Sequence, residues 1–232
     1  MVAMNDACLQ IRDYIEPVRL PERAGRLAFL EALPPLVFVR NPDWAVPNRE
    51  ECVALWDKYA MPENIREHSE VVASLAVAIA EKAIAAGADV HIPSVLASGL
   101  LHDLGKLYSI KNGGGHGQIG GAWVNSETRN PYIAQGVIQH VRWPWHIDAG
   151  VDPWLLSYCI IYADKRVQHD VVVTSEERYQ DLLKRYGYTD TAKERITRSY
   201  NQGLEIEAAL STRLKVPLHE YTFNSGRLVK RA

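Results

Sequence analysis

One segment of the chain constrains the fold more than any other, because its apolar residues recur with the period of an α-helix. The segment spans residues 62–87, and its periodic apolar positions are Ile65, Val72, Leu75, Ala76, Ile79 and Ala83. Apolar residues at this spacing cover one face of a helix, which must be buried against other elements. Pro62 suits the first turn of this helix and Gly87 suits its end.

Most of the remaining chain also has helical patterns. Helices are expected over residues 5–15, 22–33, 48–59, 93–104, 117–127, 131–142, 153–168, 175–186 and 190–213. The alternation typical of strands is nearly absent: residues 171–174 are the best candidate, and residues 219–232 form either a short strand pair or a loose tail. We therefore predict an all-α protein, built as a helical bundle with an N-terminal helical extension.

The expected helices fall into three groups along the 232 residues. Residues 1–60 are expected to form the N-terminal extension, residues 61–190 the main helical domain, and residues 191–232 a C-terminal helix and tail packed on that domain. Three roles stay open for the extension: it caps a pocket, forms the contact of a homodimer, or only lengthens the bundle.

The composition limits the classes of partner. A net charge of −2, with 47% hydrophobic and 23% charged residues, is ordinary for a soluble globular protein and predicts no broad basic surface for long nucleic acid. A small phosphorylated ligand needs only a local cluster of cations. The N-terminal residues lack the pattern of a secretory signal, and the apolar run at residues 71–80 is too short to span a bilayer. We therefore expect a cytoplasmic protein without a membrane partner.

Several histidines and aspartates lie in contexts that favour metal binding over packing. His102 adjoins Asp103 near the end of an apolar helix, His116 lies in a glycine-rich loop, and His68 is near the start of a helix whose other face is apolar. Imidazole and carboxylate groups are natural ligands of borderline divalent metals. Each of these residues, taken singly, has an equally good structural explanation as a core or surface side chain.

The order of the candidates is more informative than any one of them. The chain places them as His68, His102-Asp103, His116, His140 and Asp164, at intervals of 34, 13, 24 and 24 residues counted from Asp103 after the first. The surrounding segments read HSEVVASLAVAIA, LASGLLHDLGK, HGQIGGAWV, VIQHV and YCIIYADKRV. A second His-Asp pair, at residues 169–170, is expected to have no role in the site.

These segments resemble the HD superfamily of metal-dependent phosphohydrolases, whose signature is a histidine, a His-Asp pair and a distant aspartate. The resemblance covers roughly residues 62–187. It is greatest to bacterial bis(5′-nucleosyl)-tetraphosphatase-type HD proteins, which share the HD-x-x-K run, a His-Gly at the start of the next helix and an Ala-Asp-Lys near the end. It implies an HD-domain bundle that cleaves a phosphate ester or anhydride of a nucleotide or dinucleoside polyphosphate with a metal-activated hydroxide.

The resemblance also implies a dinuclear metal centre, because family members with extra histidines between the His-Asp pair and the last aspartate usually hold two ions. The first ion would be bound by His68, His102, Asp103 and Asp164, and the second by Asp103, His116 and His140. Asp103 would then bridge the two ions. Iron, manganese, cobalt, nickel and zinc all suit such ligands.

Nearby cations are candidates for binding the substrate phosphate. Lys106 lies one helical turn after the His-Asp pair, so it would project on a similar face. Lys165 matches the family's Ala-Asp-Lys run, and Arg166 is then expected to face solvent. Asp103, Lys106 and Lys165 are thus the expected catalytic residues, and Lys106, Lys165 and Arg142 are expected to bind substrate.

The segment after His140 departs from the family pattern, which has a small polar residue and a glycine there. Trp143 and Trp145 follow instead, and they either stack on a base or pack in the core. His146 is left out of the site, because Pro144 separates it from His140. This departure leaves the substrate open.

Two other functions are compatible with parts of the pattern. HD-fold mixed-valent di-iron oxygenases have six ligands in this same order and a lysine shortly after the His-Asp pair, so the ligands alone do not exclude oxygen chemistry. The Tyr-Ala-Asp-Lys-Arg run and the helix after it favour hydrolysis. A non-catalytic sensor is disfavoured, because a pure binding module has no need for an open centre with six ligands.

Overall fold

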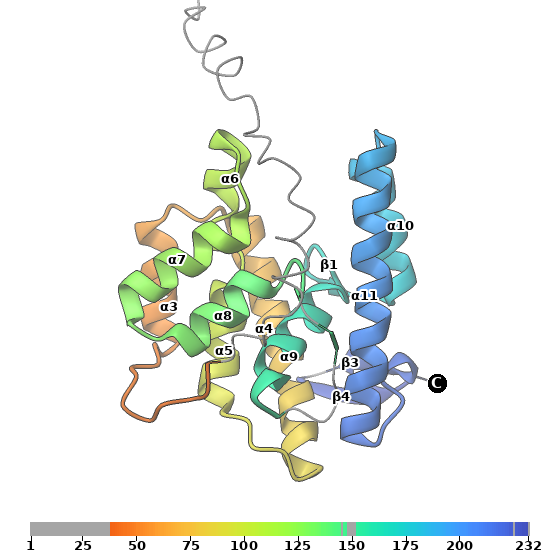
Figure 1. The fold of residues 1–232 in the computed structure, drawn as a ribbon, viewed down its shortest axis with the longest axis horizontal. Helices are drawn as coiled ribbons and strands as arrows, with labels where there is room; N and C mark the ends of the chain where they lie inside the picture. Colours follow the sequence, from red (N-terminus) through yellow and green to blue (C-terminus); the bar gives the residue numbers. More distant parts are fainter. Residues whose placement is uncertain (1–37, 145, 148–151, 225, 232) are drawn as a thin grey trace, which may run out of the picture. The chain divides into compact units, whose positions relative to one another are not determined.

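The computed structural model describes residues 38–144, 146–147, 152–224 and 226–231. All of these residues belong to one compact unit, Val37–Ala232. The helices expected at residues 5–15 and 22–33 lie outside the described residues. The described part is helical apart from two short antiparallel strand pairs, so the all-α prediction is confirmed (Figure 1).

The described elements follow one another mostly as the sequence pattern predicts. The helices are α3 (Arg49–Lys58), α4 (Glu63–Ala85), α5 (Ile92–Leu101), α6 (Lys106–Asn112), α7 (His116–Thr128), α8 (Pro131–Gln139), α9 (Leu155–Asp164), α10 (Ser175–Tyr186) and α11 (Asp190–Leu214). Two 3₁₀ turns are η1 (Asp152–Trp154) and η2 (Leu218–Glu220). The strands are β1 (Val167–Gln168), β2 (Val171–Val172), β3 (Tyr221–Asn224) and β4 (Arg227–Lys230).

Local signals define the ends of several helices. Pro62 is the N-cap of α4, and Gly87 follows that helix with a φ of +82°, which glycine adopts without the steric cost of a side chain. Asn48 caps α3 through the backbone N–H of Glu51, and Glu51 bonds back to the N-cap. Thr174 starts α10 with the same reciprocal pair of bonds.

The core lies between α4, α5, α8 and α9, which pack on one another in the middle of the unit. The apolar face of α4 predicted from the sequence is buried, including Val72, Ala76 and Ile79, each 0% exposed. The closest approach of α4 and α5 is at two small residues. A Cβ atom on Gly99 would lie 2.6 Å from the Cα atom of Ala73. The small residues therefore set the distance between the two helices.

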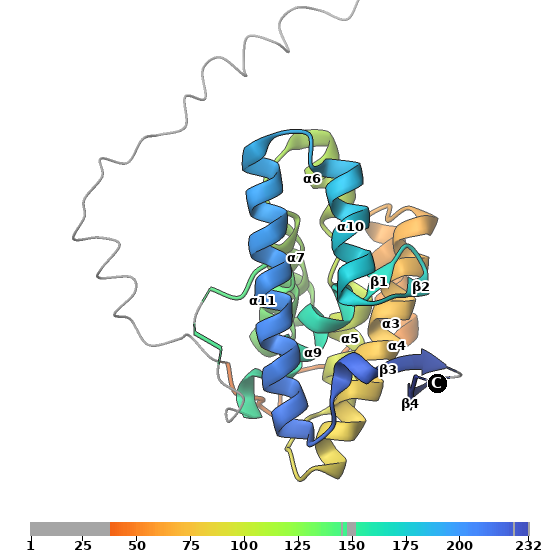
Figure 2. The same cartoon turned by 90° about the vertical axis from the view of Figure 1, so that its right-hand side faces the viewer.

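The C-terminal part packs against this core. Helices α10 and α11 form an antiparallel pair on one side (Figure 2), and the tail forms a strand pair in which Tyr221 is opposite Lys230. Arg166 joins these parts: its Nε donates to the Val173 carbonyl at 2.6 Å and its Nη2 to the Tyr221 carbonyl at 3.0 Å. The prediction that Arg166 faces solvent is therefore wrong, because its side chain is buried and its guanidinium links α9 to the strand segments by hydrogen bonds.

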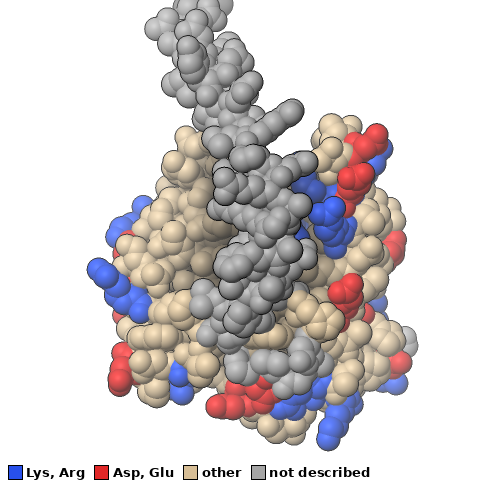
Figure 3. Space-filling view, in the orientation of Figure 1, with Lys and Arg blue, Asp and Glu red and all other residues tan. Residues whose placement is uncertain are grey.

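The surface drawn in Figure 3 shows acidic and basic side chains interspersed over the described residues of this face. Among the helices that the structure describes, none combines the length and the apolar character needed to cross a membrane.

Trp143 packs in the core, with its ring 5.4 Å from that of Trp154 and 5.0 Å from that of Tyr158, so core packing explains this residue. Trp145 lies outside the described residues.

Candidate metal centre

The His-Asp pair lies where a helix ends. Helix α5 stops at Leu101, and residues 102–105 form turns before α6 begins. On a continuous helix, adjacent side chains would diverge by about 100°; the turn instead allows His102 and Asp103 to reach the same centre. Helix α7 approaches this turn so closely that a Cβ atom on Gly105 would lie only 2.5 Å from the carbonyl oxygen of His116.

One half of the centre surrounds Asp103, whose side chain is 2% exposed. Its Oδ1 atom lies 3.3 Å from Nε2 of His116 and 3.5 Å from Nε2 of His140. Its Oδ2 atom lies 3.6 Å from Nε2 of His102. The carboxylate therefore faces imidazole nitrogens with both of its oxygen atoms.

The other half is formed by residues that are far apart in sequence. Oδ1 of Asp164, at the end of α9, lies 3.1 Å from Nε2 of His68 on α4 and 3.8 Å from Nε2 of His102. Two sets of three residues have ligand atoms within 4.8 Å of one another, namely His68, His102 and Asp103, and Asp103, His116 and His140. Asp103 belongs to both sets, and the fold thus brings together all six side chains selected from the sequence.

Three of the four imidazoles are oriented by backbone carbonyl groups. In each, Nδ1 lies 2.7 Å from a carbonyl oxygen, the pairs being His68 with His169, His102 with Gly99, and His140 with Val137. A carbonyl oxygen only accepts, so each Nδ1 carries the hydrogen. In the neutral ring, Nε2 then presents its lone pair to the centre, as in metal-binding histidines.

Two buried atoms at the centre have no hydrogen-bond partner among the described residues. Nε2 of His102 and Oδ1 of Asp103 are buried and accept no hydrogen bond from the described residues. The Nε2 atoms of His116 and His140 lie 3.0 Å apart. Buried lone pairs and anionic oxygens that face one another are unfavourable unless a cation lies between them. The residues present therefore fit bound metal ions.

The protonation states of the centre also suit metal binding. Burial lowers the pKa of His102 to about 4 and that of His116 to about 4, because a buried imidazolium loses its hydration. Burial alone would raise the pKa of Asp103, but the charge of Lys106 and the neighbouring histidines hold it well below its usual range. At neutral pH the imidazoles of His102 and His116 are therefore neutral and the carboxylate of Asp103 is ionised, which are the forms that bind a metal.

These pKa values predict the acid sensitivity of the metal-free protein. Between pH 6.5 and about 4, the unfolded chain binds protons at His102 and His116 that the folded chain does not bind. The free energy of unfolding should therefore fall as the pH falls through this window. Urea denaturation of the chelator-treated protein should show this slope, and the double variant His102→Asn with His116→Asn should reduce it. His219→Asn, at an exposed position, is the control. Equal slopes in all three proteins would contradict the assignment.

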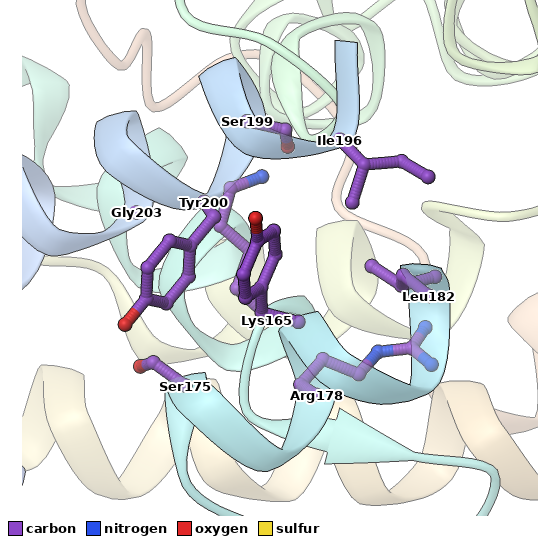
Figure 4. A pocket seen from close by; sticks show the side chains of 9 residues that line it. Lys165, Ser175, Arg178, Leu182, Ile196, Ser199, Tyr200 and Gly203 are labelled. Carbon is purple, nitrogen blue, oxygen red and sulfur yellow. The ribbon is translucent and has the colours of Figure 1, made fainter. Parts of the chain in front are cut away.

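The lysine and arginine side chains predicted to bind substrate do not all lie at the centre. Nζ of Lys106 donates to Oδ2 of Asp103 at 2.8 Å, so this lysine is at the centre. Lys165 lines a small neighbouring pocket of about 30 Å³ (Figure 4), where its stem packs on Gly203 of α11. Its Nζ lies 3.5 Å from the Val141 carbonyl oxygen. This pocket shares Arg178 and Leu182 with the cleft above the centre. Arg142 is exposed and is not among the residues that line the cleft over the centre.

A cleft of about 540 Å³ opens over the centre. It is lined by Asn64, Ile65, His68, Asp103, Lys106, Ile110, His116, His169, Arg178, Leu182, Arg185 and Tyr186. The residues from α10 were not singled out in the sequence. Arg178, Asp181 and Arg185 are spaced i, i+3 and i+7, which places them on one face of the helix. This row of charged residues is visible in the sequence. The sequence does not show, however, that it lies beside metal ligands from other helices.

The second His-Asp pair has a backbone role. His169 and Asp170 are exposed in the turn between β1 and β2, and His169 has a φ of +55°. This left-handed conformation is uncommon for a residue with a side chain. In this turn, the backbone carbonyl oxygen of His169 accepts a hydrogen bond from Nδ1 of His68. His169 therefore orients the imidazole of His68 through its main chain, which corrects the expectation that the second His-Asp pair has no role in the site.

In comparisons with known proteins, no family model and no solved structure matches this chain. The geometry of the cluster and the sequence pattern are therefore the observations that bear on its function. Buried histidine and aspartate groups that could hold a metal ion are present.

Proposed function

We propose that this protein is a metal-dependent phosphohydrolase of the HD type, which cleaves a phosphate ester or anhydride bond in a nucleotide or dinucleoside polyphosphate. One observation supports this proposal above the others: Asp103 lies between two sets of imidazole nitrogens. A single carboxylate in that position can bridge two cations. The order of the six ligands in the sequence, which resembles that of the HD superfamily, supports the same conclusion.

The residues of the chain would divide between two cations. His68, His102, Asp103 and Asp164 would hold the first, and Asp103, His116 and His140 the second. Cations bound there would acidify a water molecule and offset negative charge on phosphoryl oxygens. The nitrogen and oxygen ligands suit iron, manganese, cobalt, nickel or zinc.

The charges of the site favour an anionic substrate. Two carboxylates only partly neutralise two divalent cations, so net positive charge remains for a phosphate. Lys106 adds to it: burial alone would lower its pKa, but the charge of Asp103 raises it above the usual value, so the amino group stays protonated. Its side chain is 35% exposed and lines the cleft. Lys106 can therefore donate a hydrogen bond to a phosphoryl oxygen while Asp103 remains at the centre.

Elemental analysis, combined with a substrate screen, tests the proposed function. We expect about two metal ions per chain and release of phosphate from nucleotides or dinucleoside polyphosphates. Chelation should stop the reaction, and one of the five metals should restore it. The opposite result would be an anaerobically purified, iron-loaded protein that consumes oxygen with a polyol or phosphonate and leaves every phosphate ester intact. That result would favour the oxygenase alternative.

Replacement of Lys106 by alanine should leave the metal content unchanged and lower kcat/KM by about tenfold or more, since a charge-assisted hydrogen bond to phosphate would be lost. Lys111→Ala removes an exposed lysine from the same short helix and is the matched control. Steady-state kinetics and elemental analysis of both variants check this prediction. Equal kinetics in the two variants would exclude a role for Lys106 in substrate binding.

A further inference from the structure

The wall of the cleft across from α6 is formed by α10. Lys106 and Ile110 of α6 line one side, and Arg178, Leu182 and Arg185 of α10 line the other. The ribbons of the two helices are well separated in Figure 1. This wall therefore brings two arginine side chains, Arg178 and Arg185, to the cleft, and neither belongs to the sequence pattern of metal ligands.

Arg178 is held in a defined orientation by its own helix. Its Nη1 atom donates to Oδ2 of Asp181 at 2.9 Å, and the two side chains are only 13% and 11% exposed. Nη1 of Arg185 approaches the same carboxylate oxygen at 3.3 Å. An exposed ion pair between flexible side chains would impose little order. A largely buried carboxylate that is shared by two guanidinium groups positions both of them.

Arg178 retains donors and charge that its neighbours do not satisfy. Its Nε atom is buried and has no hydrogen-bond partner among the described residues. A guanidinium has five N–H donors in a planar fork, and Asp181 accepts from one atom of it. One carboxylate also balances only one of the two arginine charges. A buried donor without a partner is unfavourable, so the arrangement suits an anion that enters the cleft.

We propose that Arg178 is a substrate-binding residue. Its guanidinium donates hydrogen bonds to oxygen atoms of the phosphate from the side of the cleft opposite Lys106. Asp181 is its positioning residue. The planar fork of arginine matches two phosphate oxygens at once, whereas the ammonium group of Lys106 acts as a point charge. This inference rests on the proposed function, which makes a phosphate group the ligand of the cleft.

The test compares Arg178→Gln with Arg195→Gln in the metal-loaded full chain. Arg195 is exposed on α11 and lines none of the cavities described above, so its replacement removes the same charge at another place. The probes are inorganic phosphate, titrated by calorimetry, and the kinetics of phosphate release. Arg178→Gln should weaken phosphate binding and lower kcat/KM by about tenfold or more. Metal content and thermal stability should remain those of the parent protein, and Arg178→Lys should recover part of the loss.

Asp181→Asn provides an independent variant. It keeps the arginine but releases its guanidinium, so we expect a rise in KM that is smaller than that of Arg178→Gln, with unchanged metal content. A structural role of the pair would instead lower the melting temperature and the metal content along with phosphate binding. That result would overturn the inference.

The remaining outcomes separate the inference from the proposed function. If Arg178→Gln behaves like Arg195→Gln while the parent protein hydrolyses its substrate, the inference fails and the proposed function stands. If the parent hydrolyses no ester but binds inorganic phosphate, and Arg178→Gln weakens that binding, the anion site stands and the proposed function fails. Absence of both binding and hydrolysis in the parent protein would overturn both.

Discussion

Replacement of Asp103 by asparagine should deprive the protein of metal and of the proposed phosphohydrolase activity while it remains folded. The carboxylate faces three imidazole nitrogens at 3.3 to 3.6 Å and belongs to both sets of ligands. Asparagine keeps the shape of the side chain but removes the negative charge that offsets two cations. Because bound metal contributes several kcal/mol of transition-state stabilisation, activity should fall by a factor on the order of a thousand.

The chain contains a matched control for this variant in its second His-Asp pair. Asp170→Asn makes the same chemical change in an exposed turn, where the carboxylate takes no part in the centre. Its metal content and activity should equal those of the parent protein. Elemental analysis, circular dichroism and phosphate release should be measured on both variants. Full metal occupancy in Asp103→Asn would mean that the assigned centre is wrong.

Replacement of Gly99 by alanine should destabilise the protein and weaken metal binding together. A Cβ atom at this position would lie 2.6 Å from Cα and 2.8 Å from Cβ of Ala73, so α4 and α5 would have to separate. Such overpacking costs about 1–3 kcal/mol, although alanine by itself favours a helix over glycine by about 1 kcal/mol. His68 is on α4 and His102 follows α5, so the same movement would displace two ligands relative to each other.

Urea denaturation and metal titration of Gly99→Ala measure the two effects. Adding Ala73→Gly should restore part of both losses, because it removes the Cβ atom nearest to the new methyl group, while the clash with the backbone remains. A stable Gly99→Ala protein with the metal affinity of the parent would show that the α4–α5 contact does not position the ligands.

Much of the fold could be predicted from local patterns. The apolar period and the flanking Pro62 and Gly87 define α4, and the structure places this helix at residues Glu63–Ala85. The tail, for which both a strand pair and a loose end were open, forms the β3–β4 pair. Helix signals are interactions between residues a few positions apart, so they can be read without knowledge of the tertiary contacts.

The candidate ligands could likewise be selected from the sequence, because a metal centre requires particular residue types, and their order along the chain is distinctive. The surroundings of the ligands could not. Gly99, His169 and Val137 orient three imidazoles through their carbonyl groups. Every residue has such a carbonyl, so this role leaves no trace in the residue type.

The sequence by itself determined most of the helices and the six residues that could bind metal, since both depend on local spacing and on side-chain chemistry. It did not indicate helix α6, and it extended α9 to residue 168, where the structure has a turn and strand β1. Only the tertiary structure decided the roles of the cations. Lys165 and Arg166 are adjacent, and the sequence favoured Lys165 toward the substrate and Arg166 toward solvent. In the structure Lys165 lies in a pocket beside α11, and Arg166 is buried against the strands. Arg178 enters the cleft because of how α10 packs on the unit. The direction of a helical side chain depends on the rotation of its helix against its neighbours, which residues distant in sequence determine.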